Sequence, residues 1–273
     1  MSDETERRLI FGSVAEQYDR HRPGYPDVLV DEVLAYTGVS AFGGPQATTA
    51  LEVGGGTGKA TRLFAARGLD VTVLEPDPEM LAINHSRADL ENLDVNFQLS
   101  DFEHAEFEPH SFQLVYSATA WHWVTPELRY ELAAQALRKG GALATFWNRP
   151  AWQDTPLRRA FDEAYASVAE AFDAVGAGPM YPAPGVVVLQ ADELTHELSG
   201  RSDFGDVQIS THRWTVPYGT AEYLALLGTH SDHILIGEAA RERLFAGIAA
   251  AIEANGGAFE MTYEALICLA RAL

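Results

Sequence analysis

Between residues 48 and 148, short apolar runs alternate with segments that carry helix signals, and this alternation constrains the fold more than any other feature of the chain. Helices are expected over residues 60–67, 78–89 and 126–138. The runs predicted as strands are residues 50–53, 71–74, 95–99, 112–116 and 142–147. Strand–helix–strand units of this length connect into a mainly parallel sheet with helices on both faces, which predicts an α/β protein.

The later part of the chain has a different rhythm. We expect an amphipathic helix over residues 155–174 and interpret residues 149–205 as an inserted cap, because strand signals resume only after them. The next predicted strand covers residues 207–216, and a slip in its apolar phase predicts a β-bulge midway. The remaining expected elements are a helix at 238–254 and an alternating strand at 259–264.

A glycine cluster, Glu52-Val-Gly-Gly-Gly-Thr-Gly58, lies between the first predicted strand and the first helix. Glycines at this place let the backbone approach a ligand closely, and the helix N-terminus that follows offers free N–H groups to an anionic group. A P-loop is excluded because it requires glycine where Val53 stands and Ser or Thr where Ala60 stands. The dinucleotide fingerprint Gly-x-Gly-x-x-Gly fails as well, since its third glycine would fall on Lys59 or on Thr61.

The pattern that fits is an acid followed by Gly-x-Gly-x-Gly, with Glu75 at the end of the next strand. This arrangement resembles the class I S-adenosylmethionine-dependent methyltransferases, and in particular the methyltransferase type 11-like and trans-aconitate-methyltransferase-like groups that act on small molecules. The resemblance is strong over residues 10–148 and looser over residues 206–273. The other segments that carry it are residues 11–26, 99–102, 116–123 and 137–143.

This resemblance implies a Rossmann-like, doubly wound α/β fold. Its sheet would have seven mostly parallel strands with an antiparallel last strand, helices on both faces and an inserted helical cap. The chain would be a single methyltransferase domain over residues 1–273. The parts of that domain would be an N-terminal lead-in or lid at 1–45, a cofactor-binding core at 46–148, the cap at 149–205 and the completion of the sheet at 206–273.

The resemblance also implies S-adenosylmethionine as the cofactor. Gly54, Gly56 and Gly58 would lie under its methionine portion. Glu75 would accept hydrogen bonds from both ribose hydroxyls, as an acid at this place does in dinucleotide enzymes. The full set of cofactor-binding residues would be Tyr18, Glu52, Gly54, Gly56, Gly58, Glu75, Pro76, Met80, Asp101, Phe102, Ser117 and Ala118.

Several members of this set have roles that the resemblance assigns individually. Asp101 would meet the adenine amino group, with Phe102 beside the ring. Ser117 and Ala118 would pass under the methionine moiety. Glu52 would orient the glycine loop or meet the ammonium group of the ligand through water. Tyr18, on the lead-in helix, would close over the cofactor or simply pack its helix against the core.

The methyl acceptor is expected beyond the fourth predicted strand. A general base is needed only for an acceptor that is not already deprotonated, because a sulfonium carries its own leaving group. His122 stands at this place and is expected to act as the base, to orient the acceptor, or to be structural. Trp121 and Trp123 suit the wall of an apolar or aromatic site, with one of the two in the core. The expected substrate-binding residues are Trp121, Trp123, Trp152, Tyr181, Tyr223 and His230.

The charge balance argues against large polyanionic partners. The chain has 19 Lys and Arg against 39 Asp and Glu, a formal net charge of −20. Lys59 and Lys139 are its only lysines, so a basic stripe for nucleic acid or an anionic membrane could be built only from scattered arginines. Cys268 is the only cysteine, which excludes an internal disulfide. His230 and His233 are interpreted as part of a pocket-rim loop, and no metal is expected.

These observations together predict a cytoplasmic enzyme, monomeric or homodimeric, that acts on a small-molecule acceptor. Residues 1–8 are polar and acidic, which argues against a secretory signal, and no apolar run approaches the ~20 residues that span a bilayer. Two alternatives stay open. One is an NAD(P)-dependent oxidoreductase, which the failed fingerprint disfavours, and the other is an S-adenosylmethionine-binding protein that does not methylate.

Overall fold

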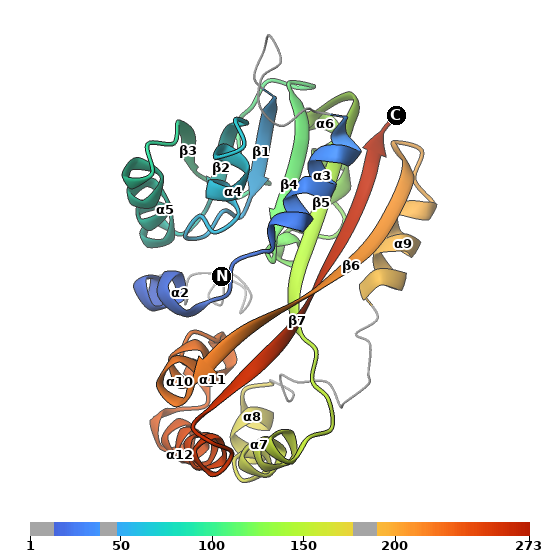
Figure 1. The fold of residues 1–273 in the computed structure, drawn as a ribbon. Coiled ribbons are helices and arrows are strands. Elements are labelled where there is room, and N and C mark those ends of the chain that lie inside the picture. The colour runs from blue at the N-terminus through green and yellow to red at the C-terminus, as the bar shows by residue number, and fades with distance from the viewer. Residues whose placement is uncertain (1–13, 39–47, 177–189) are drawn as a thin grey trace.

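The computed structural model describes residues 14–38, 48–176 and 190–273. Seven strands form one sheet in the order β3-β2-β1-β4-β5-β7-β6 (Figure 1). Strands β1 to β5 run parallel, and β7 is antiparallel to both of its neighbours. This confirms the predicted doubly wound sheet with an antiparallel last strand. The bounds are β1 Thr49–Val53, β2 Asp70–Glu75, β3 Val95–Leu99, β4 Phe112–Ala118, β5 Leu137–Pro150, β6 Phe204–Gly219 and β7 Ala258–Ala272.

Helices cover both faces of this sheet. One face is packed by α3 (Asp27–Thr37), α4 (Thr61–Ala65) and α5 (Pro78–Leu90), which share one hydrophobic cluster with the strands. The other face is packed by α6 (Arg129–Ala136) and α9 (Gln190–Ser199) through a second cluster. Burial of apolar side chains on both faces makes the central strands almost continuously apolar, as parallel strands require.

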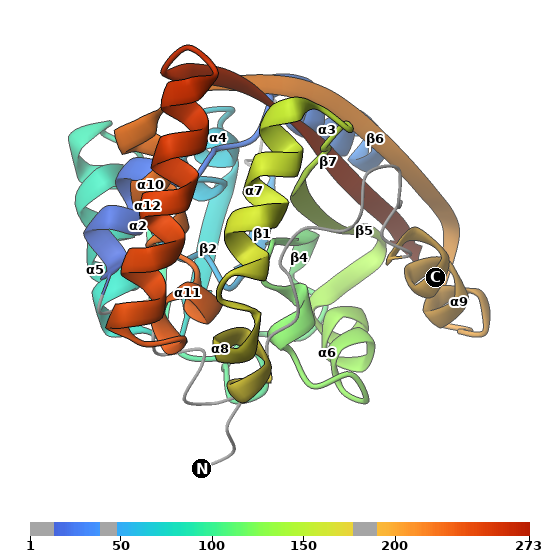
Figure 2. The ribbon, with the colours of Figure 1, turned by 90° about the horizontal axis from the view of Figure 1, so that it is seen from below.

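We call one group of helices the lower lobe. It lies beyond the ends of β5 and β6 and the beginning of β7 (Figures 1 and 2). These helices and the ends of β6 and β7 share a third hydrophobic cluster, in which α7 packs along α12. No helix within the described ranges has both the length and the apolar character that a membrane crossing requires. The helices of the lower lobe are α7 (Pro156–Ala166), α8 (Ala169–Ala174), α10 (Thr220–Leu227), α11 (Ser231–Leu235) and α12 (Glu238–Ala254).

The structure changes the expected organisation of the segment between β5 and β6. The helix predicted over 155–174 is two helices, α7 and α8, because the chain turns at Ser167 and Val168. Only these two join the lower lobe, whereas α9 packs back on the sheet. The rest of the lobe is α10 to α12, from residues 206–273, where α12 was the only expected helix.

The predicted bulge in the middle of β6 is wrong. Pairing with β7 is continuous from Gln208 to Gly219, and the register shift lies earlier, between Gly205 and Gln208. The slip in apolar phase has another cause. Ser210 and His212 face α3, where both side chains bind the carboxylate of Glu32. The apolar phase changes because β6 buries different faces along its length: Ile209 packs in the cluster of α6 and α9, whereas Trp214 packs in the cluster of α3 on the opposite face.

Candidate functional site

A cavity of about 550 Å³ opens at the carboxyl ends of β1 and β4, where the strand order reverses. Ligands of open α/β sheets bind at this switch point. We call one side of the cavity the glycine-loop end, because it is formed by the turns after β1, β2 and β3. The opposite side is the aromatic end, whose main side chains are Tyr25, His122, Trp123, Trp147, Tyr223 and Tyr263.

The glycines of the loop after β1 serve two different purposes. Gly54, Gly56 and Gly58 all have positive φ, at 72°, 54° and 86°. A Cβ on Gly54 would lie 2.5 Å from the Cβ of Ala120, and one on Gly58 would lie 2.1 Å from Oδ1 of Asn84. Protein packing therefore excludes side chains at Gly54 and Gly58. Gly58 was expected to lie under the cofactor, but it does not line the cavity. Gly56 lines it, with nothing within 4 Å of its Cβ position among the described residues.

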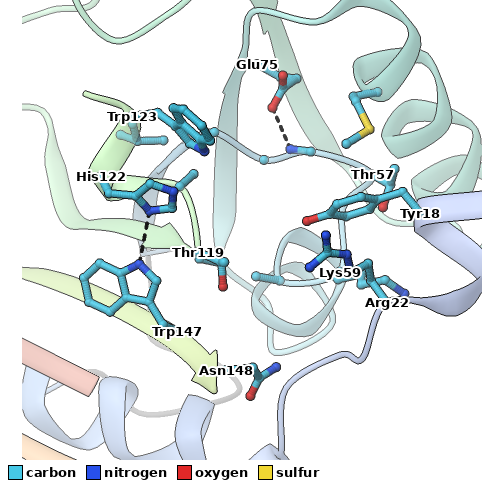
Figure 3. Close-up of a pocket in the computed structure, with 18 of the residues that line it drawn as sticks. Tyr18, Arg22, Thr57, Lys59, Glu75, Thr119, His122, Trp123, Trp147 and Asn148 are labelled. Atoms are coloured by element: carbon cyan, nitrogen blue, oxygen red, sulfur yellow. Dashed lines mark hydrogen bonds between the residues drawn. The ribbon is translucent and has the colours of Figure 1, made fainter. Parts of the chain in front are cut away.

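Glu75 lies at the end of β2 and is held by the backbone on both sides. Its Oε2 accepts a hydrogen bond from the Gly56 amide at 2.8 Å, and its Oε1 accepts one from the Asp77 amide at 2.9 Å (Figure 3). The side chain lines the cavity and is otherwise buried. Burial raises the pKa of Glu75 to about 7 despite these two amides. Each oxygen keeps a second lone pair with which a ligand hydroxyl can bond.

Glu52 is wholly buried under the glycine loop and also lines the cavity. Its Oε2 accepts hydrogen bonds from the Thr61 hydroxyl at 2.5 Å and the Tyr116 hydroxyl at 3.0 Å. None of the described residues donates a hydrogen bond to Oε1. Burial raises the pKa of Glu52 to about 8, which both hydroxyls partly oppose. A buried oxygen without a partner is costly, so this atom is suited to a polar ligand group.

The turns after β2 and β3 supply the other predicted cofactor residues, and Pro76, Met80, Asp101 and Phe102 all line the cavity. Oδ1 of Asp101 accepts hydrogen bonds from the amide of His104 at 2.9 Å and from its Nδ1 at 2.6 Å, which fixes the turn. The buried ring of Phe102 lies 6.2 Å from that of Trp121. These contacts hold the loop after β3 in place before any ligand arrives.

Two neighbouring residues at the end of β4 differ in their exposure to the cavity. Ala118 lines it, as predicted. Ser117 does not, because its side chain is wholly buried and its hydroxyl donates to the carbonyl of Val53 at 2.8 Å. The hydroxyl of Ser117 thus links β4 to β1.

Helix α2 (Ala15–His21) contacts both α5 and the lower lobe. Its buried Asp19 pairs with Arg87 of α5 at 2.7 Å, and Nζ of Lys59 donates to the carbonyl of Asp19 at 2.7 Å. Burial lowers the pKa of Lys59 to about 8. Arg22, just beyond the helix, donates from Nε to the Thr229 hydroxyl of the lower lobe at 2.8 Å. Tyr18, Arg22 and Lys59 all line the cavity (Figure 3).

The aromatic end begins with the short helix η2 (Trp121–Trp123) after β4. His122 is exposed to the cavity, and its ring lies 4.8 Å from that of Trp123. The indole Nε1–H of Trp147 points to Nδ1 of His122 at 3.4 Å (Figure 3). Trp121 is wholly buried in the core beside Tyr130, so of the two predicted wall residues only Trp123 reaches the cavity.

Thr119 has a backbone conformation that is rare for a β-branched residue, with φ of +59°. Its amide donates to the carbonyl of Phe146 at 2.8 Å, and its hydroxyl lies 2.8 Å from that of Tyr25. The Tyr25 ring packs edge-on against Phe146, and burial raises its pKa above the ordinary value for tyrosine. Strained residues that surrounding contacts hold in place cluster at functional sites. Thr119 lies between the two ends of the cavity (Figure 3).

The remaining predicted substrate residues are divided. Tyr223 and His230 line the cavity, and burial lowers the pKa of His230 well below its ordinary value. Trp152 does not line it, because its ring packs against Phe161 at 5.6 Å and against Phe259 at 6.0 Å inside the lower lobe. Tyr181 lies outside the described residues.

Sequence reasoning missed several residues of the cavity wall. Lys59 follows the glycine loop directly, and Trp147 to Arg149 stand at the carboxyl end of β5, so the rule that ligands bind at strand ends would have found both. No local signal marks the other wall residues of the lower lobe, because they become neighbours only in the tertiary structure. Those residues are Leu226, Ser231, Met261 and Tyr263.

Comparison with known proteins gives consistent matches. Residues 50–141 match a family model described as a methyltransferase domain. A Mycobacterium tuberculosis protein named as an uncharacterized methyltransferase is 37% identical over 140 residues, which cover 51% of this chain and 52% of that protein. The chain thus matches about half the length of that relative.

Two solved structures share the fold. One, from Anaeromyxobacter dehalogenans and described as a type II methyltransferase, superposes with a TM-score of 0.64 at 17% identity, over 92% of this chain and 97% of that one. The other is phosphoethanolamine N-methyltransferase 2 of Haemonchus contortus with phosphomonomethylethanolamine and S-adenosylhomocysteine. It superposes with a TM-score of 0.53 at 18% identity, over 99% of this chain and 59% of that one.

Proposed function

We propose that this chain, which belongs to the class I S-adenosylmethionine-dependent methyltransferase family, transfers a methyl group from S-adenosylmethionine to a small organic acceptor. The sequence and fold matches confirm the predicted family. One observation carries the proposal: a single cavity of about 550 Å³ is lined both by the acid-tipped glycine loop and by a group of aromatic side chains. A cavity of this kind holds donor and acceptor side by side, as methyl transfer requires.

The glycine-loop end fits the cofactor in three respects. Gly56 leaves open space above the loop, Glu75 presents two oxygens that backbone amides have already oriented, and Oε1 of Glu52 is a buried acceptor without a partner among the described residues. Bound S-adenosylmethionine supplies a methyl group on a sulfonium, which makes that methyl group electrophilic. Glu75 would bind the ribose hydroxyls, and Glu52 would bind the ammonium group of the ligand.

Other residues of this end complete the proposed cofactor site. Asp101 would use Oδ2 for the adenine amino group, since its Oδ1 is engaged by His104. Phe102, Pro76 and Met80 would pack around the adenine and ribose, where their apolar surfaces exclude water. Tyr18 would cover the methionine portion from α2.

The aromatic end would bind the acceptor. Trp123, Trp147 and Tyr223 provide flat apolar surface, and His122 and Thr119 provide polar groups among them. Such a wall binds a small molecule in one orientation and displaces its water. Alignment of a nucleophile with the methyl group can provide several of the roughly 7–11 kcal/mol available from positioning.

Calorimetry tests the proposal with three ligands: S-adenosylmethionine, S-adenosylhomocysteine and NADH. We expect both sulfur ligands to bind with a stoichiometry of one and NADH not to bind. Mass spectrometry of a small-molecule acceptor panel incubated with S-adenosylmethionine should then detect a product heavier by one methylene group. Binding of NADH alone would overturn the proposal in favour of an oxidoreductase.

A further inference from the structure

The contact between Trp147 and His122 favours one tautomer of the histidine. Trp147 lies near the end of β5 and is almost wholly buried, so its indole is held in one orientation. Its Nε1–H points to Nδ1 of His122 at 3.4 Å (Figure 3). An indole N–H only donates hydrogen bonds, so Nδ1 must carry a lone pair. The proton of the neutral imidazole is then on Nε2.

This arrangement opposes the use of His122 as a general base. A base that accepts a proton at Nε2 would have to begin as the tautomer protonated on Nδ1 and end as the imidazolium. Both species carry a hydrogen on Nδ1, which would face the hydrogen of the Trp147 indole. The same contact favours His122 as a hydrogen-bond donor through Nε2–H.

A second group at the aromatic end has the same donor character. The Tyr25 and Thr119 hydroxyls bond to each other at 2.8 Å, and burial raises the pKa of Tyr25 above its ordinary value, so this pair stays protonated. Among the carboxylates that line the cavity, Glu103 has its Oε1 engaged by the amide and hydroxyl of Thr125, at 2.9 and 2.8 Å. The Oε2 atom of Glu103 is buried. The other titratable side chains that line the cavity are Tyr18, Arg22, Glu52, Lys59, Glu75, Asp101, Arg149, Tyr223, His230 and Tyr263.

We infer that Trp147 is a positioning residue that holds His122 as an Nε2–H donor, and that the acceptor presents an oxygen that is already ionised. The inference rests on the proposed methyl transfer and deepens it. A lone pair of such an oxygen forms the new O–CH3 bond while the C–S bond breaks and its electron pair stays on sulfur. The negative charge of the oxygen and the positive charge of the sulfonium disappear together, so no proton has to be removed.

Nitrogen-15 NMR of the histidine ring nitrogens tests the tautomer directly, with the S-adenosylhomocysteine complex from about pH 5 to about pH 8. We expect the wild-type His122 to stay neutral with its proton on Nε2 throughout. Trp147→Phe keeps an aromatic ring but removes the N–H, and should let His122 titrate within this range. The signal of His122 is assigned from its loss in His122→Gln. His85, exposed on α5, is the control whose titration should not change.

The wild-type spectrum alone decides the tautomer, even if Trp147→Phe does not fold. A proton on Nδ1, or an imidazolium at pH 7, overturns the inference, and so does a folded Trp147→Phe in which His122 behaves as in the wild type. The acceptor class is tested by adding benzoate or benzylamine to the same complex. We expect benzoate to shift the Nε2 signal and benzylamine not to shift it; no response to benzoate overturns the ionised-oxygen part. If S-adenosylhomocysteine does not bind, the proposed function is overturned. The tautomer of His122 can still be measured in the unliganded protein, so the two failures are distinguishable.

Discussion

The two ends of the cavity are built in different ways. The glycine-loop end consists mainly of turns that directly follow β1, β2 and β3, and these turns lie within the matched methyltransferase segment, residues 50–141. The aromatic end combines the end of β4 with Tyr25, the end of β5 and residues of the lower lobe. Most of the lower lobe lies outside that segment.

The glycine-loop end is shaped by contacts within short stretches of chain, whereas the aromatic end is assembled from distant segments. At the glycine-loop end, backbone amides and packed glycines fix the shape through short-range contacts, such as those of Glu75 with Gly56 and Asp77. At the aromatic end, side chains far apart in the chain meet because the lower lobe packs as a unit. The first kind of site suits the proposed cofactor, and the second kind suits the proposed acceptor. Four predictions test this contrast, from the largest expected effect to the smallest.

The sharpest test of a preformed loop is a pair of glycine substitutions. Gly58→Ala should lower the free energy of unfolding by about 2–4 kcal/mol, because it adds a left-handed backbone cost to a clash with Asn84. Gly56→Ala, its matched control, has the backbone cost but open space, and should lose about 1–2 kcal/mol. Urea unfolding measures both. In binding, Gly56→Ala should be the more impaired of the two, since its methyl group enters the cavity. Equal stabilities would show that packing does not shape the loop.

Glu75→Ala should weaken S-adenosylhomocysteine by about 1.5–3 kcal/mol, because hydrogen bonds to a charged group are lost. Calorimetry measures the change, and Glu79→Ala, on the exposed surface of α5, is the control that should bind normally. Since burial raises the pKa of Glu75 to about 7, wild-type affinity should also fall as the pH drops below 7 and the carboxylate is protonated. Unchanged affinity in the variant would remove Glu75 from the cofactor site. Circular dichroism should verify its fold.

Glu52→Gln should make the unliganded protein more stable at pH 8 by about 1–3 kcal/mol. The pKa of Glu52 rises from 4.5 to about 8 on folding, so the folded state binds its proton more tightly. The stability that this tighter proton binding adds to the folded state is complete below pH 4.5 and is lost as the pH rises through about 8. Urea unfolding between about pH 5 and pH 8 should therefore give a steeper decline for the wild type than for Glu52→Gln. Parallel declines would mean that Glu52 is ionised in the folded protein throughout.

The smallest effect is expected at the hydrogen bond between Arg22 and Thr229 of the lower lobe. Thr229→Val removes the hydroxyl that accepts from Arg22 and should cost about 1 kcal/mol in the free energy of unfolding. Amide hydrogen exchange in α2 should become faster, because α2 loses one of its contacts with the lower lobe. Thr220→Val, whose hydroxyl bonds to Glu253 within the lobe, should leave exchange in α2 unchanged. Faster exchange in both variants would show that α2 responds to the stability of the lobe and not to this bond.

The sequence predicted much of the fold because its signals are local. The helix expected at 238–254 has these bounds in the structure, and the strand expected at 95–99 does as well. Errors arose where a distant partner decides the outcome. The apolar phase of β6 changes because Ile209 packs in the cluster of α6 and α9 whereas Trp214 packs in that of α3 on the opposite face, which the sequence of β6 does not reveal.

The candidate site divides along the same line. Local turns place Glu75, Asp101 and Gly56 in the cavity wall as the sequence predicted. Gly58 and Ser117 belong to the same motifs, yet contacts with Asn84 and Val53 turn them to packing. Membership of a motif places a residue near the site. The residues packed around it decide whether it faces the ligand.

The amino-acid sequence by itself determined the alternation of strands and helices over residues 48–148, the glycine loop and the acid at the end of β2, because nearby residues restrict backbone conformation. Only the tertiary structure decided which aromatic side chains line the acceptor end and that Trp147 lies against His122. Such contacts join residues from separate segments, and they form only when burial of apolar surface brings those segments together.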